Sequence, residues 1–304
     1  GLYGTTEIAL PDEDRFAGMS HAEALTAFES EPPIRVLFEE GAADGFPARS
    51  PMPRFEAAFD SWPVPEAVAT EWYLTGAGRL GNSPNEGTSS TDYLALPDAI
   101  PQTFFDGSGN IWSVDVEWDW QEGGPGTFAA WATDPLAAET VVVGSGSVDL
   151  YVQSNLGDTD LEVTITEVRP DGQEMYVQSG WLRASHRTLD DAESTELRPV
   201  HTHFETDASP LPDGQFELVR VELLPFAHVF REGSRIRLIV DAPGGNRAEW
   251  AFDTIAGGEQ VTIGHDPLFS SRLVLPVVPT VDAPDDYPEC GALRGQPCRT
   301  YTGP

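Results

Sequence analysis

The sequence has few cysteines, few basic residues and no long apolar run. Among 304 residues there are two cysteines, and 17 basic residues stand against 50 acidic ones, which gives a net charge of −33. Such an excess of negative charge repels nucleic-acid phosphates and anionic lipids, so neither nucleic acid nor a membrane surface is an expected partner. No stretch approaches the roughly 18 consecutive apolar residues of a membrane-spanning helix. The acidic residues are scattered along the chain, which indicates a solvated and highly soluble surface.

The two cysteines lie close together near the C-terminus. Cys290 and Cys298 enclose a short loop that contains Gly and Pro, and no further Cys or His lies beside them. Such a pair makes a poor zinc site and favours a disulfide that holds the tail, which is typical of a secreted or extracytoplasmic protein. The opening residues have neither the basic start nor the apolar run of a signal peptide. We therefore interpret a chain beginning at Gly1 as a processed or partial product.

A repeated alternation of apolar and polar residues marks the middle of the chain. Residues 148–152 and 161–165 place Val, Leu or Ile at every second position, which is typical of half-buried strands. The tetrapeptide at residues 169–172, Arg-Pro-Asp-Gly, has the composition of a tight turn between the second strand and a third. Antiparallel strands with one dry face need a second sheet to cover that face, so the pattern predicts a β-sandwich.

The chain divides into three parts by composition. Residues 1–33 are interpreted as a connecting arm, in which the capping-box spacing of Ser20 and Glu23 predicts a short helix that ends before Pro32 and Pro33. Residues 34–279 are expected to form the sandwich, and residues 280–304 an irregular tail held by the disulfide. Within the sandwich we expect a polar loop at 81–91, a short helical patch at 54–59, and strands at 34–38, 71–75, 216–224, 235–240, 260–263 and 272–277.

Five sequence segments occur in the same order as the corresponding segments of a known protein family. They are PIRVLFEEG, FDSWPVPEAVATEWYLTGAGRL, GSGSVDLYVQSNLGDTDLEVTITEVRPDGQ with GWLRASHR, ELLPFAHVFREGSRIRLIV and SSRLVLPVVP. In this order the chain resembles the C-terminal jelly-roll domain of the cocaine-esterase and X-Pro dipeptidyl-peptidase type serine hydrolases, the CocE/NonD family. The resemblance implies an all-β fold, a jelly-roll (galactose-binding-like) β-sandwich.

In that family an α/β-hydrolase domain that precedes the jelly roll performs the reaction. Its nucleophilic serine lies on a G-x-S-x-G turn, and this chain has no such motif: residues 144–147 and 107–109 lack the spacing. The resemblance therefore gives this chain no catalytic residues and no cofactor. It implies the C-terminal portion of a secreted serine hydrolase, with the N-terminal catalytic part as partner, in the same precursor or as a separate chain.

Histidines and adjacent polar residues were the first candidates for chemistry. His201 and His203 share a face if they lie on a strand, which suits two metal ligands, but we favour the interpretation that they lie in a loop or edge strand beside the acidic stretch. Ser185 and His186 would point to opposite faces of a strand, which disfavours a nucleophile and base. We expect His228 in a strand with a satisfied hydrogen bond, and His265 in a turn.

An Asn/Asp cluster in one loop has the oxygen ligands that calcium prefers. Asn155, Asp158 and Asp160 could contribute to a Ca²⁺ site, while solvated turn residues are the plainer interpretation, and we assign no metal.

Four tryptophans remain as candidate substrate or domain-interface aromatics: Trp112, Trp118, Trp120 and Trp131. Aromatic side chains among acidic residues can stack on sugars or line a substrate pocket, and they can equally pack on a catalytic domain or in the core. The alternative function is therefore a stand-alone carbohydrate-binding β-sandwich, and a third is a purely structural or adhesive domain.

Overall fold

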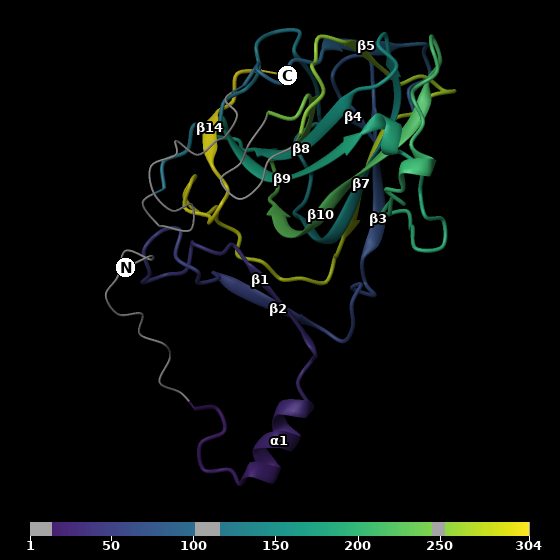
Figure 1. Ribbon diagram of the computed structural model, residues 1–304. Helices are drawn as coiled ribbons and strands as arrows, with labels where there is room; N and C mark the ends of the chain where they lie inside the picture. Colours follow the sequence, from purple (N-terminus) through teal and green to yellow (C-terminus); the bar gives the residue numbers. More distant parts are fainter. Residues whose placement is uncertain (1–13, 101–115, 245–252, 304) are drawn as a thin grey trace.

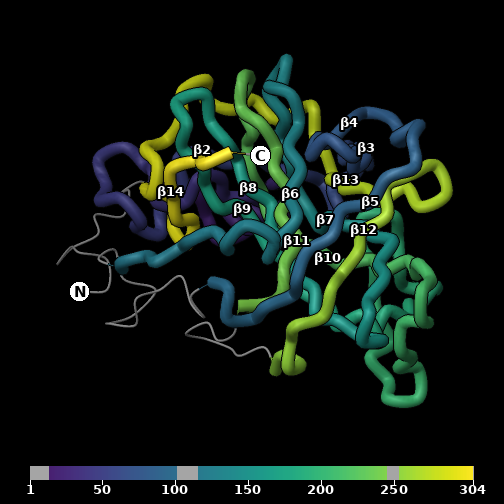
Figure 2. The backbone as a smooth tube through the Cα atoms, turned by 90° about the horizontal axis from the view of Figure 1, so that it is seen from above, coloured from purple at the N-terminus to yellow at the C-terminus, as the bar shows by residue number. Residues whose placement is uncertain are grey.

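Two antiparallel β-sheets pack face to face in the computed structural model, which describes residues 14–100, 116–244 and 253–303. Seen from above, β8, β9 and β11 lie in one layer and β7, β10 and β12 in the other (Figure 2). The prediction of an all-β sandwich is confirmed. The described residues contain no helix that is long and apolar enough to span a membrane.

The larger sheet has seven strands arranged around β7. Its hydrogen-bonded order is β4-β3-β13-β7-β12-β5, and β10 also pairs with β7. Its strands are β3 (Val68–Leu74), β4 (Leu80–Gly81), β5 (Ser90–Leu94), β7 (Thr140–Ser154), β10 (Glu217–Phe230), β12 (Gln260–Gly264) and β13 (Arg272–Val277).

The smaller sheet has five strands in the order β14-β9-β8-β11-β6. Two short 3₁₀ helices, Ala184–His186 and Glu205–Asp207, follow β9 in the chain. The strands are β6 (Phe128–Ala132), β8 (Asp160–Val168), β9 (Gln173–Arg183), β11 (Arg235–Asp241) and β14 (Cys298–Thr300).

β7 is paired along both of its edges. β10 pairs with residues 140–152 of β7, while β13 pairs with residues 142–149 and β12 with residues 151–154. Because β10 occupies one edge from residue 140 to residue 152, β12 and β13 must lie end to end along the other edge. One strand thus connects the whole larger sheet.

The main core fills the space between the two sheets. Val148 and Leu150 of β7 face Leu161 and Val163 of β8 and Leu238 of β11, and all five side chains are fully buried. The alternation read from the sequence therefore identified the inward faces of these strands. The predicted turn also forms: Gly172 has φ +82°, a left-handed conformation that glycine adopts without strain.

A two-stranded ribbon of β1 (Ile34–Phe38) and β2 (Phe55–Phe59) lies at the end of the molecule near helix α1 (His21–Glu29) (Figure 1). The inner face of this β1–β2 ribbon packs Phe38 and Phe59 on Val141, Val143 and Val229 of the larger sheet, which makes a second and smaller core.

Two expectations about local structure were wrong. Residues 54–59 were expected to form a helical patch, but Phe55–Phe59 is strand β2, paired in register with β1. The Ala and Glu residues of this segment favour a helix only weakly, and pairing with β1 overrides that preference. The tail is not wholly irregular either, because Cys298–Thr300 adds strand β14 to the edge of β9.

Candidate functional site

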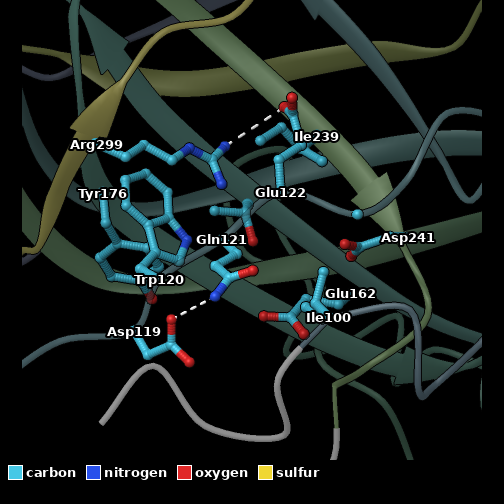
Figure 3. Close-up of a pocket in the computed structure, with 12 residues that line it drawn as sticks. Ile100, Asp119, Trp120, Gln121, Glu122, Glu162, Tyr176, Ile239, Asp241 and Arg299 are labelled. Atoms are coloured by element: carbon cyan, nitrogen blue, oxygen red, sulfur yellow. Dashed lines mark hydrogen bonds and ion pairs between the residues drawn. The ribbon is translucent and has the colours of Figure 1, made fainter. Parts of the chain in front are cut away.

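A small pocket lies on the outer face of the five-stranded sheet (Figure 3). Since Leu161 and Val163 point into the core, Glu162 and Thr164 on the same strand must point outward, and both line this pocket. Residues 119–123 form a wall, and the volume is about 30 Å³, comparable to the share of one water molecule. The pocket is therefore too small for a sugar or peptide substrate in this conformation.

Trp120 forms the aromatic side of the pocket. The guanidinium of Arg299, from β14, lies 3.9 Å from the centre of the Trp120 ring, and Tyr176 meets the indole edge-on at 6.0 Å. A cation over the face of an indole is a favourable contact, so this ring is fixed in place. The same contact occupies one of the two indole faces on which a sugar could stack.

A buried carboxylate joins four strands beside the pocket. Glu174 of β9 accepts hydrogen bonds from Arg237 of β11 at 2.7 Å, Arg299 of β14 at 2.8 Å and Thr166 of β8 at 2.8 Å. Glu122 lies 2.6 Å from the guanidinium of Arg237 and extends the network to the wall segment. These four strands are thereby connected by side-chain interactions as well as by backbone hydrogen bonds.

The charges of this network hold Glu174 in its ionised form. Burial raises the pKa of the Glu174 carboxyl, but the guanidinium groups of Arg237 and Arg299 lower it by more, so that the pKa lies below its ordinary value. A carboxylate fixed as an anion between two arginines is a poor proton donor at neutral pH. The arrangement thus serves structure and not acid–base chemistry.

The four candidate tryptophans do not form one cluster. Trp131 lies on β6 in the main core, 1% exposed, and its indole N–H donates to the carbonyl of Thr75 at 3.1 Å. Trp118 is half-buried just before the pocket wall, whereas Trp120 lines the pocket. Trp112 lies outside the described residues. Core packing explains Trp131, and the role of the other three as interface aromatics stays a prediction.

Three histidines gather at the surface beyond β9. The ring centres of His201 and His203 are 5.7 Å apart, and those of His186 and His203 are 6.1 Å apart. Burial, followed by the neighbouring His203, lowers the pKa of His201 to about 4, so its ring is neutral near pH 7. In the part of the chain that the structure describes, no three His, Cys, Asp or Glu side chains are placed to hold a metal ion.

The remaining histidine candidates lie in other surroundings. Ser185 and His186 belong to the 3₁₀ helix Ala184–His186 and not to a strand, because the chain turns there after β9. His228 lies in strand β10, as expected, but it is buried, and its Nε2, 3.3 Å from the carboxylate of Glu167, lacks the expected well-formed hydrogen bond.

One serine–histidine contact was not foreseen from the sequence. Ser89 Oγ lies 2.6 Å from His265 Nδ1, and Thr91 Oγ1 lies 2.9 Å from His265 Nε2. A hydroxyl therefore occupies the position where a catalytic relay has a carboxylate, and Asn85 also donates to Ser89 Oγ at 2.7 Å. This buried imidazole joins the segment before β5 to the end of β12. A separation of 176 residues along the chain left no local signal of it.

The three candidate calcium ligands form hydrogen bonds or ion pairs with other residues of the protein. Asn155 Oδ1 accepts from the backbone N–H of Gln260 at 2.9 Å, and Asp158 accepts from Ser185 N–H at 2.9 Å. Asp160 pairs with Arg183 at 2.7 Å. All three side chains thus stabilise loops at the end of the sandwich.

Fold and site together define an accessory β-sandwich domain. In residues 14–100, 116–244 and 253–303 no serine hydroxyl contacts a histidine that also contacts a carboxylate: His265 lies between Ser89 and Thr91, while Ser234 and His228 each contact Glu167. The comparisons with known proteins agree. The family model described as the X-Pro dipeptidyl-peptidase C-terminal non-catalytic domain matches residues 26–247, and the chain belongs to this family.

Curated relatives carry related names and are much longer. A protein of Mycobacterium bovis named as a serine esterase is 26% identical over 229 residues, which cover 72% of this chain and 35% of the relative. Cocaine esterase from a Rhodococcus species is 24% identical over 240 residues, covering 71% of this chain and 39% of the relative. The chain therefore spans little more than a third of the length of the curated relatives that it matches.

Solved structures share the fold. A CocE/NonD family hydrolase from Staphylococcus aureus superposes with a TM-score of 0.57 at 20% identity, covering 74% of this chain and 39% of that one. An α-amino-acid ester hydrolase superposes with a TM-score of 0.53 at 18% identity, covering 77% and 42%. The expected family resemblance is confirmed, and the chain is a C-terminal domain of the CocE/NonD type.

Proposed function

We propose that this domain is the C-terminal part of a longer hydrolase that cleaves ester or amide bonds through an acyl-enzyme intermediate. The observation that carries the proposal is the family match over residues 26–247, joined to relatives of which this chain spans only 35–39%. In the proposed enzyme a Ser-His-Asp relay and an oxyanion hole lie in an upstream α/β-hydrolase domain. This upstream domain is the partner of the sandwich, in the same precursor or as a separate chain.

The sandwich contributes structure to that enzyme. It covers apolar surface of the catalytic domain and forms one wall of the substrate cleft. With a net charge of −33 the wall disfavours anionic substrates near the cleft. The Cys290–Cys298 disulfide, a predicted bond that forms in the structure, supports our proposal of an extracytoplasmic location.

Expression of the complete reading frame tests this function. We expect the full-length product to hydrolyse a p-nitrophenyl ester or an amide, and residues 1–304 alone to leave both substrates intact. Turnover by residues 1–304 in isolation would place the nucleophile in this domain and refute the proposal. A full-length product that is folded but inactive on both substrate classes would refute it as well.

The carbohydrate-binding alternative has less support. The comparisons favour the hydrolase domain, and Arg299 covers one of the two faces of Trp120 on which a sugar could stack. A glycan pull-down with residues 1–304 alone should therefore recover no protein above the level of an unrelated acidic control.

A further inference from the structure

Helix α1 is well formed locally but touches little of the sandwich. Ser20 and Glu23 make a complete capping box, in which Ser20 N–H donates to the Glu23 carboxylate at 2.8 Å. None of its nine residues is buried, and the helix projects clear of the two sheets (Figure 1). Isolated helices shorter than ~12–15 residues are marginal in water, so caps alone do not hold such a helix. A packing surface for α1 is missing from the described residues.

The arm carries apolar side chains that have no cover. Leu25 and Phe28, three residues apart, share one side of α1 and are 46% and 57% exposed, and Met19 beside the cap is 47% exposed. Amphipathic helices normally bury such a stripe against a core. The stripe on α1 therefore indicates a contact that lies outside these residues.

The β1–β2 ribbon lies between α1 and the sandwich (Figure 1) and also has an exposed apolar residue. Its inner face is packed, with Phe38 stacked on Phe55 at 4.7 Å, but Leu37 on the outer face is 52% exposed. Arg35 and Glu56, also on the outer face, form an ion pair with each other. An outer face with an apolar centre and internally neutralised charge can be covered by a partner without leaving an unpaired charge.

Exposed apolar side chains are concentrated in this part of the chain. Of the twelve exposed large hydrophobic residues in the described part of the chain, six come from residues 19–68; this N-terminal apolar set is Met19, Leu25, Phe28, Leu37, Trp62 and Val68. Single exposed apolar residues are ordinary on a surface, whereas apolar residues that share one face of an element with nothing packed on it indicate an interaction site.

We propose that the upstream catalytic part of the same precursor docks on the α1 arm and on the outer face of the β1–β2 ribbon, through four members of the N-terminal apolar set: Met19, Leu25, Phe28 and Leu37. The inference rests on the proposed function and names the contact surface. Its occupant follows from the missing length: the relatives extend to more than twice the matched region, and the family model describes a C-terminal domain, so the extra polypeptide comes before the arm. That polypeptide is tethered to the arm, so its effective concentration at this face is high.

Hydrogen exchange on the complete protein tests the contact. We expect amides of residues 21–29 to exchange at least tenfold more slowly in the full-length protein than in residues 1–304 alone. The double substitution Leu25→Asp/Phe28→Asp should abolish this protection. A matched double substitution at exposed apolar positions far along the chain, Leu156→Asp/Leu268→Asp (67% and 80% exposed), should retain it.

Three results would overturn the inference. The first is equal exchange of residues 21–29 in both proteins, and the second is protection that survives Leu25→Asp/Phe28→Asp. The third is protection that appears in residues 1–304 alone as their concentration rises, which would assign this face to self-association. Unfolding of the isolated variants provides the folding control, because both pairs are exposed there. Ester hydrolysis is measured on the same samples, so an active enzyme with an unprotected helix refutes the docking face while the proposed function stands.

Discussion

At the scale of single residues, Glu174 holds together the charged side chains on the outer face of the smaller sheet. Its carboxylate accepts hydrogen bonds from Thr166, Arg237 and Arg299, which lie on three other strands. Without Glu174 both arginines lose their main counter-charge. Arg237 is itself fully buried. Without Glu174, Arg237 and Arg299 would share Glu122 as their counter-charge, so one buried positive charge would stay uncompensated.

Glu174→Gln is therefore expected to lower the free energy of unfolding by about 3 kcal/mol. Urea titration followed by circular dichroism measures the change. Glu56→Gln is the matched control, because Glu56 pairs with Arg35 on the solvent-exposed face of the ribbon and should give no measurable shift. Equal midpoints for Glu174→Gln and the unmodified protein would show that the network contributes little.

His201 gives the domain a specific dependence on pH. Its pKa is about 4 in the folded protein against an ordinary value of 6.5, because burial disfavours the charged ring. The unfolded chain therefore binds the proton more tightly between these two values. The contribution to stability is complete above pH 6.5 and is lost progressively as the pH falls toward 4.

His201→Gln should remove about 1 kcal/mol of the stability lost between pH 7 and pH 5, a value reduced for partial solvent access. Urea midpoints at these two pH values measure the difference. His21→Gln on α1, an exposed position, should leave the pH dependence as it is. A parallel response of both variants would exclude His201 as the titrating group.

At the scale of elements, the two sheets approach each other closely where β9 contacts β10. A Cβ atom on Gly180 of β9 would lie 1.9 Å from the carbonyl oxygen of Glu222 on β10. Real atoms do not approach so closely, so any larger residue must separate the strands at this point. Glycine is needed here because of packing between sheets and not because of its backbone angles.

Gly180→Ala is expected to destabilise the domain by about 3 kcal/mol or more, since overpacking a rigid contact displaces backbone. Thermal unfolding measures the effect. Gly87→Ala is the control, because a Cβ atom there meets no neighbour within 4 Å. If the two variants melt together, the sheets separate more easily than this geometry implies.

Some elements of this fold could be predicted from the sequence and others could not. The central hairpin was predictable because its alternation and its Pro-Asp-Gly turn are local signals, and the disulfide because its cysteines are eight residues apart. Strand β2 was missed because only its partner β1, some twenty residues earlier, makes it a strand. The Glu174 network and the Ser89–His265 contact join positions that are far apart in the sequence, so no local sequence pattern predicts them.

At the scale of the whole molecule, charge is the dominant feature. All 17 basic residues are arginine and the sequence has no lysine, while 50 acidic residues leave a net charge of −33. Several arginines are engaged in partly or fully buried pairs, which leaves many surface carboxylates to repel one another. Self-repulsion of this kind destabilises a compact state.

The melting temperature should therefore rise by several degrees between 0.05 and 1 M sodium chloride, because the screening length falls to about 3 Å at the higher concentration. Differential scanning calorimetry measures it. Chloride is the appropriate anion, since sulfate also strengthens apolar burial. A melting temperature that stays constant or falls with salt would show that charge repulsion is unimportant here.

The arrangement of strands around β7 has a consequence for the continuity of the chain. β12 and β13 bind the same edge of β7, and the connection between them exposes Leu268 to 80%. A protease that cleaves this connection at Leu268 would break one peptide bond without removing any backbone hydrogen bond between β7 and β12 or between β7 and β13. The nicked molecule would keep its shape and size in native conditions, and its two pieces would part only under denaturing electrophoresis.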